Sequence, residues 1–184
     1  GERNTVAELN AHPQYDSASQ ENDIMLVKLA THTHNTNDSL PLLGKQVKLI
    51  GFKRTTVTGN VSRELFVVDV NVLDWRTCDI LTSTPTFEDS QVCAGVLAGG
   101  RDSCSGDSGG PLLGAGNVQY GITSFGVGCA QPNQPAFYTR VSHYNTWIRE
   151  VVCILASEPP DDCRFATETM SPSDVQSESP TISP

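Results

Sequence analysis

The chain has 184 residues, of which 38% are hydrophobic, and its formal net charge is −9 at neutral pH. This length allows one or two compact domains. The negative charge argues against nucleic acid or an anionic membrane surface as the main partner. The sequence has no apolar stretch of about 18 residues, so we expect no transmembrane helix.

Short apolar runs separated by Gly, Pro and Asn turns predict a fold made mostly of strands. We expect strands at residues 6–9, 23–29, 47–52, 65–72, 91–95, 119–125 and 136–141. A short helix is expected at 74–81. Strands at this spacing are typical of a barrel or a sandwich.

The C-terminal region changes character twice. Ser142 is a candidate N-cap, and the apolar residues after it fall on one helical face, namely Tyr144, Trp147, Ile148, Val151 and Val152. These features predict an amphipathic helix over 142–153. Residues 154–184 are rich in Ser, Pro and Thr, so we expect a disordered tail there.

The six cysteines indicate disulfides, and therefore an oxidising compartment and a secreted, extracellular protein. Six cysteines can pair in about 15 ways. The close C-x₂-C spacing that zinc sites use is missing, so we expect no metal and no other cofactor. For Cys153 and Cys163, closeness in the sequence is the only reason to pair them.

The most specific motif is Gly106-Asp107-Ser108-Gly109-Gly110-Pro111. A serine between glycines has little side-chain cover, so its hydroxyl can face a cleft. The backbone N–H groups of Gly106 and Ser108 could form a pair of donors for a developing oxyanion. A Gly-rich turn is the alternative interpretation. Six specified residues in a row arise by chance on the order of once in ten million positions. This rarity favours a catalytic serine over a simple turn.

This motif resembles the active-site segment of the trypsin-like serine proteases, which have the chymotrypsin fold. A second segment, with His12-Pro13, Tyr15 and then Asp23-Ile24-Met25-Leu26, is similar to the part of that family that carries the triad aspartate. The resemblance implies an all-β double β-barrel with a C-terminal helix. It makes residues 1–153 a protease domain, with 1–40 the remnant of an incomplete first barrel and linker, and 41–153 the second barrel and helix.

The resemblance also implies roles in acyl-enzyme hydrolysis. Ser108 would be the nucleophile, and Asp23 would orient a histidine and stabilise its imidazolium. The N–H groups of Gly106 and Ser108 would form the oxyanion hole. In the family, the residue at Asp107 pairs with an N-terminal amine that zymogen cleavage frees.

A substrate pocket is implied by Asp102, Ser124, Phe125, Gly126 and Ala136. A carboxylate on the floor of a largely apolar slot would bind Arg or Lys, because only a cation offsets the burial of its charge. The family usually has Trp at Phe125 and Gly at Ala136, and the extra methyl group of Ala136 would narrow the slot. The expected partners are protein or peptide substrates with Arg or Lys before the cut bond, and protein inhibitors.

Two disulfides are implied by the resemblance, Cys78 with Cys93 and Cys104 with Cys129. The pair Cys153 and Cys163 has no counterpart that we can place in the family.

The family's catalytic histidine has no counterpart in the sequence, because His12, His32, His34 and His143 all lie in other contexts. We therefore expect a truncated chain that is inactive by itself. One alternative is a catalytically inactive homologue that acts as a binding or inhibitory protein. Another is a structural surface protein in which the tail continues as a stalk.

Overall fold

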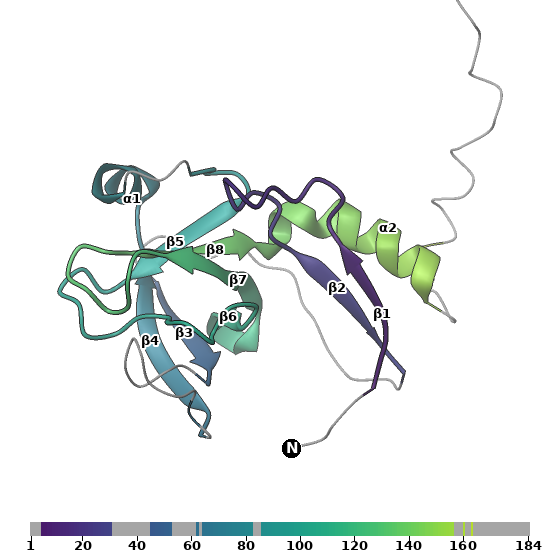
Figure 1. Cartoon of the computed structure of the whole chain (residues 1–184), viewed down its shortest axis with the longest axis horizontal. Coiled ribbons are helices and arrows are strands. Elements are labelled where there is room, and N and C mark those ends of the chain that lie inside the picture. Colours follow the sequence, from purple (N-terminus) through teal and green to yellow (C-terminus); the bar gives the residue numbers. More distant parts are fainter. Residues whose placement is uncertain are drawn as a thin grey trace, which may run out of the picture. The chain divides into compact units, whose positions relative to one another are not determined.

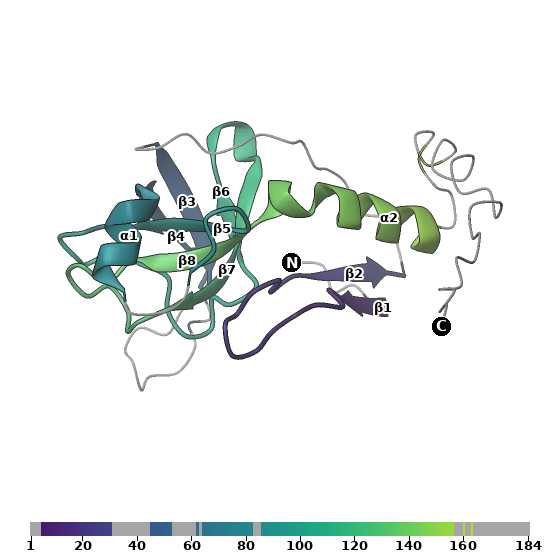
Figure 2. The same cartoon turned by 90° about the horizontal axis from the view of Figure 1, so that it is seen from above.

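The computed structural model describes residues 5–30, 45–52, 62, 64–82, 86–156, 160 and 163. The chain divides into two compact units, Gly1–Thr146 and Trp147–Pro184. Figure 1 shows the elements in sequence colours, and Figure 2 gives a second view of them.

The first unit contains a closed antiparallel barrel, drawn from blue-grey to green in Figure 1. Its strands pair in the order β3-β4-β5-β8-β7-β6, and β6 closes the barrel by pairing with β3. The strands are β3 (Gln46–Gly51), β4 (Phe66–Val72), β5 (Gln91–Gly95), β6 (Pro111–Leu113), β7 (Gln119–Gly126) and β8 (Ala136–Arg140). The predicted all-β barrel fold is confirmed.

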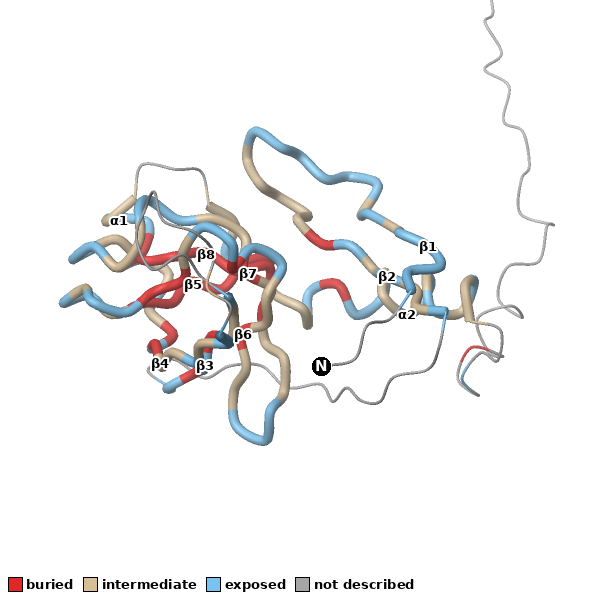
Figure 3. The backbone as a smooth tube through the Cα atoms, turned by 60° about the horizontal axis from the view of Figure 1, so that its bottom comes forward, coloured by how far each residue is buried: buried red, intermediate tan, exposed pale blue. Residues whose placement is uncertain are grey.

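Alternation along the strands creates the barrel core. In β3, Val47 and Leu49 are buried while Gln46 and Lys48 are exposed, as expected for a strand with one face inward. Val70 and Val72 of β4 repeat this pattern, and all of β5 is buried. Figure 3 shows these buried stretches in red, gathered on the barrel strands.

A second sheet has only two antiparallel strands, β1 (Val6–Ala11) and β2 (Met25–Leu29). Leu9 lies opposite Val27 in the register, and both side chains are exposed. Val6 and Met25 are also exposed, so the sheet leaves apolar side chains open among the described residues. Asp23 precedes β2, whereas the sequence predicted that it opens the strand.

The short helix α1 (Trp75–Leu81) begins one residue after the predicted start at Asp74. Asp74 is its N-cap, and the Asp74 side chain accepts a hydrogen bond from the backbone N–H of Arg76 at 3.0 Å. The Cys78–Cys93 disulfide joins the helix to β5. The Trp75 ring meets the ring of Phe137 edge-on, with centroids 5.9 Å apart.

Sequence reasoning also missed two short elements and misplaced the start of the C-terminal helix. Sequence reasoning missed β6 and the 3₁₀ helix η1 (Ala115–Asn117), because three-residue elements are too short to show a period. The C-terminal helix α2 (Asn145–Leu155) starts three residues after the predicted N-cap, Ser142. Ser142 lies inside a 3₁₀ helix, η2 (Val141–Tyr144), where the buried Tyr144 fixes the chain.

The second unit holds most of α2 and the Cys153–Cys163 disulfide. In the described part of the chain, no helix has both the length and the apolar character needed to cross a membrane. Residues 31–44, which include the end of the predicted first-barrel remnant and linker at 1–40, lie outside the described residues, as does nearly all of the predicted tail at 154–184.

Candidate active site

Residues from three separate stretches of the chain line one cavity of about 190 Å³ in the first unit. Six of the predicted site residues are among its lining, namely Asp102, Ser108, Ser124, Phe125, Gly126 and Ala136. They come from the loop between β5 and β6, from β7 and from the start of β8. The barrel therefore brings together residues that are up to 34 positions apart (136 − 102).

Ser108 lies on an exposed turn just before β6, at the edge of the cavity. Gly106 has φ of 102°, a conformation that a residue with a side chain rarely adopts. Within the described residues, the backbone N–H groups of Gly106 and Ser108 donate to no acceptor. Both donors are therefore available to an oxygen atom brought beside Ser108.

Asp102 supplies the buried negative charge of the cavity. Its side chain is only 5% exposed. One carboxylate oxygen accepts the N–H of Ser103 at 2.8 Å, and the other accepts the N–H of Ala130 at 3.2 Å. Hydrogen bonds of this kind stabilise the charged form of a carboxyl group. A cation entering the cavity would find this charge already held in place.

Ser103 is a polar residue of the cavity that sequence reasoning missed. The hydroxyl of Tyr138 donates to the Ser103 hydroxyl oxygen at 3.2 Å. Burial raises the pKa of Tyr138, so its hydroxyl remains a donor at neutral pH. The Ser103 oxygen accepts this bond and has a second lone pair that can accept a hydrogen bond from a donor in the cavity. Its position directly after Asp102 was the signal that could have identified it.

Asp23 does not line the cavity itself but is hydrogen-bonded to Ser124, which does. The hydroxyl of Ser124 donates to the Asp23 carboxylate at 2.6 Å, and Ser124 itself lines the cavity. The hydroxyl of Thr139 donates to the Asp23 carbonyl oxygen at 2.7 Å. Two barrel strands, β7 and β8, therefore hold the aspartate that the sequence places 85 positions before Ser108 (108 − 23).

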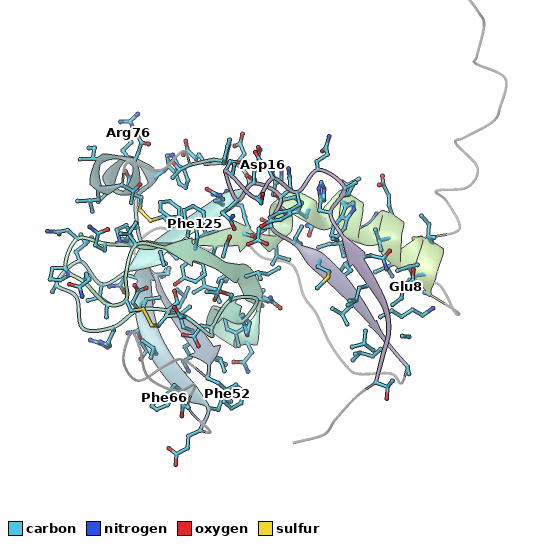
Figure 4. All side chains as sticks on the ribbon, viewed as in Figure 1. Glu8, Asp16, Phe52, Phe66, Arg76 and Phe125 are labelled. Atoms are coloured by element: carbon cyan, nitrogen blue, oxygen red, sulfur yellow. A yellow bond between two sulfur atoms is a disulfide. The ribbon has the colours of Figure 1, made fainter. Side chains whose placement is uncertain are left out.

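The aromatic side of the cavity is formed by Phe125. Its ring stacks on the ring of Phe137, with centroids 4.9 Å apart and planes 14° apart. Figure 4 labels Phe125, which lies between the barrel strands and α1. Stacking on a buried ring fixes the orientation of Phe125 beside the cavity.

Gly126 and Ala136 are cross-strand partners in β7 and β8. A methyl group on Gly126 would lie 3.2 Å from the Ala136 Cβ, closer than most such contacts. The space beside Gly126, where a side chain would otherwise lie, is therefore bounded by the Ala136 methyl group. Both residues line the cavity.

The Cys104–Cys129 disulfide ties the serine loop to the segment after β7. Cys104 also lines the cavity, together with Ser105, Thr123 and Gly128. Sequence reasoning had not placed these last three at the site. All three lie within three residues of a predicted site residue, and this closeness was the available signal.

Neither described histidine lines the cavity. His12 and His143 both lie against the ring of Tyr144, with centroids 5.4 and 4.8 Å from it. Burial and the nearby His143 lower the pKa of His12. His32 and His34 lie outside the described residues. Among the described residues, no group of three or more His, Cys, Asp or Glu side chains could hold a metal ion.

Comparison with protein families matches residues 1–148 of this chain to the model described as "Trypsin". Human "Serine protease 1" is 37% identical, over 80% of this chain and 62% of the human protein. Canine "Anionic trypsin" is 38% identical, over 79% of this chain and 62% of its own length. "Trypsin eta" of Drosophila melanogaster is 36% identical, over 78% of this chain and 58% of its own length. The chain thus spans about three fifths of the length of these relatives.

Proposed function

Because this chain belongs to the trypsin family of serine proteases, we propose that it carries the nucleophile and substrate pocket of a serine endopeptidase. The enzyme hydrolyses peptide bonds after Arg or Lys through an acyl-enzyme. The observation that carries this proposal is that Ser108 and the buried carboxylate of Asp102 line the same cavity. A substrate residue whose extended cationic side chain occupies that cavity would have its backbone beside Ser108.

In the proposed reaction, the Ser108 oxygen attacks the carbonyl carbon of the bond to be cut while a histidine base takes the hydroxyl proton. The carbonyl oxygen becomes an oxyanion, which the N–H groups of Gly106 and Ser108 receive. The histidine then gives its proton to the leaving amine, and the C–N bond breaks. Water releases the acyl group from Ser108 by the same steps, with the histidine again acting first as base.

Asp23 is proposed to orient the base and to stabilise its imidazolium. Its hydrogen bond from Ser124 and the bond from Thr139 to its carbonyl support this role, because both restrict where the carboxylate can lie. A carboxylate held in this way keeps the histidine in the useful tautomer.

The preference for Arg and Lys rests on Asp102. A cation in the cavity would pair with a carboxylate whose two oxygens already accept backbone N–H bonds. A neutral substrate side chain would lack the charge-assisted hydrogen bonds that a cation can make with this carboxylate. The hydroxyl oxygen of Ser103, which also lines the cavity, can accept a further hydrogen bond from the bound cation.

The base is proposed to be a histidine that these 184 residues do not contain, since none of their four histidines lies in the context that the family uses. The chain alone is therefore proposed to be inactive. Residues 1–153 are proposed as the protease-domain part and 154–184 as a tail. Extracellular location and inhibition by proteins are proposed from the disulfides and the family.

The test uses protein expressed from the complete coding sequence. Hydrolysis of an arginine ester, a lysine ester and a neutral ester is compared with that by Ser108→Ala. We expect the two basic esters to be preferred and Ser108→Ala to lower kcat by about 10⁶-fold. Ser105→Ala is the matched control, because it removes a hydroxyl from the same cavity wall, and it should retain activity.

Two results would contradict the proposal. Hydrolysis that persists in Ser108→Ala would exclude Ser108 as the nucleophile. A complete protein that binds basic peptides without cutting them would indicate the binding homologue instead.

A further inference from the structure

The end of strand β3 packs directly against the loop that carries Ser108. Gly51 is the last residue of β3, and Asp107 immediately precedes the serine. A methyl group built on Gly51 would overlap Asp107 Oδ1 and would lie 2.8 Å from its Cγ. Real Cβ atoms essentially never come within 3.0 Å of another heavy atom in this way. The Asp107 carboxylate therefore occupies the space that any other residue at position 51 would need.

Asp107 cannot easily move aside. Its side chain is only 8% exposed, and one of its carboxylate oxygens accepts the N–H of Cys104 at 3.0 Å. Its own backbone N–H donates to the Cys104 carbonyl at 2.9 Å, and its carbonyl accepts the N–H of Gly110 at 2.8 Å. Cys104 is in turn fixed by its disulfide to Cys129. The Asp107 side chain is short and is fixed both at its carboxylate and at its backbone. A group that pushed against this side chain would therefore displace the backbone of the serine loop.

A second close approach supports the first. A methyl group on Gly110 would lie 2.7 Å from the Asp107 carbonyl oxygen and 3.0 Å from the Ile50 carbonyl oxygen. The turn after Ser108 thus meets the backbone of β3 beside Gly51. Contacts from both sides of Ser108 therefore converge on the last two residues of one strand.

We infer that Gly51 is a positioning residue for the serine loop. Its missing side chain lets the Asp107 carboxylate lie against β3, and this contact fixes the backbone that presents the Gly106 N–H and the Ser108 hydroxyl. This role rests on the function proposed above. The cavity charge does not depend on it, because Asp102 is held by the N–H groups of Ser103 and Ala130.

The first test measures coupling in the 184-residue chain and needs no activity. The folding equilibrium constant is measured by urea unfolding for Gly51→Ala, Asp107→Ala and the double variant. We expect Gly51→Ala to lower this constant by about tenfold or more alone, but by less than about threefold in the Asp107→Ala background. Equal effects in both backgrounds would overturn the inference. If Gly51→Ala does not fold, we expect the double variant to fold. A double variant that also fails to fold would overturn the inference.

The second test uses protein from the complete coding sequence. We expect Gly51→Ala to lower kcat for an arginine ester by about 100-fold. Binding of benzamidine, an aryl amidine that probes Asp102, should change by less than about threefold, because the cavity floor is held independently. Gly114→Ala is the matched control, since its methyl group would overlap the Tyr120 ring, 2.6 Å from Cζ, without contact to Asp107. It should lose stability but keep its kcat.

The outcomes separate the two proposals. An active parent with an equally active Gly51→Ala variant would overturn the positioning role alone. A parent that never hydrolyses the ester would overturn the proposed function and, with it, the catalytic part of this inference. Loss of benzamidine binding together with kcat in Gly51→Ala would indicate general collapse of the loop and would contradict a positioning role.

Discussion

Among the single residues of the site, Ala136 lines the same cavity as the buried carboxylate of Asp102, and we expect its methyl group to narrow this cavity. Ala136 lies opposite Gly126 in the β7–β8 register, so its methyl group takes up space that the glycine leaves. A planar guanidinium is wider than an ammonium group. The methyl group should therefore hinder an arginine side chain more than a lysine side chain.

The expected result for Ala136→Gly, in protein from the complete coding sequence, is a rise of about tenfold in the ratio of kcat/KM for an arginine ester to that for a lysine ester. The rise follows from the room regained for the guanidinium. Steady-state kinetics on the two esters measure it. An unchanged ratio would show that Ala136 does not limit the slot.

His12 makes the stability of the chain depend on pH. Its pKa is lowered from 6.5 in the folded protein, by burial and by the neighbouring His143. Above pH 6.5 the ring is largely neutral in both the folded and the unfolded state, so stability is unaffected there. As the pH falls through 6.5 the unfolded chain binds the proton more readily, and the folded state loses stability.

His12→Gln should therefore remove part of this acid sensitivity. Urea unfolding of both proteins between pH 7.5 and 5.5 gives the comparison, and the stability of the variant relative to the parent should rise as the pH falls. A difference that stays constant with pH, or shrinks on acidification, would contradict the lowered pKa.

Some residues of the site can be predicted from sequence because a contiguous motif marks them. Ser108 and Gly106 stand in one run, and the resemblance to the family assigned Asp102, which precedes this run closely, to the same site. The contact of Gly51 with Asp107 has no such mark, since 56 positions separate the two residues (107 − 51) and barrel closure brings them together. The catalytic roles of all these residues stay predictions.

At the scale of elements, the Cys78–Cys93 disulfide joins α1 to β5. Both cysteines are buried, and they pack with Phe137 in a small apolar cluster. The bond closes a loop of 15 residues. In the chain-entropy model, a loop of this size contributes about 3 kcal/mol to the free energy of unfolding.

The variant Cys78→Ala/Cys93→Ala should therefore lose about 3 kcal/mol in unfolding free energy, with a further loss from the cavity left by two sulfur atoms. Urea unfolding followed by the fluorescence of Trp75, in a Trp147→Phe background, provides the measurement. Cys153→Ala/Cys163→Ala is the control, because that bond lies in the other unit and should leave the barrel transition unchanged. Barrel stability unaffected by loss of the first bond would contradict this account.

The longer elements followed from the sequence, while their ends and the shortest element did not. Alternating β-branched residues identified β4, and Asp74 marked the start of α1. By contrast, Ser142 looked like an N-cap, but burial of Tyr144 keeps the chain in a 3₁₀ turn until Asn145. Tertiary packing overrode the local signal there.

At the scale of the whole first unit, hydrogen bonds join the β1–β2 segment to the barrel. Ser124 and Thr139 of the barrel bind Asp23, and the Tyr144 hydroxyl donates to the Asn22 side chain at 3.1 Å. Residues more than 100 positions apart are thus held together. The resemblance placed Asp23 in the triad, but these partners became visible only in the folded chain.

Ser124→Ala should lower the unfolding free energy of the 184-residue chain by about 1.5–3 kcal/mol, as expected when a hydrogen bond to a charged group is lost. The partly exposed position favours the lower end of this range. Ser105→Ala, an exposed serine near the same cavity, is the control and should cost little. Equal stability of the two variants would indicate that the bond to Asp23 does not hold the segment.

We propose that Ser108 is a nucleophile beside a cavity that binds cations. Protein from the complete coding sequence is treated with a fluorophosphonate, which loses fluoride when a serine oxygen bonds to its phosphorus, and the modified peptide is identified by mass spectrometry. The account predicts a single adduct on Ser108, slowed by benzamidine in the parent but not in Asp102→Asn. An adduct on another residue, no adduct at all, or labelling of the parent that benzamidine leaves unchanged would contradict it.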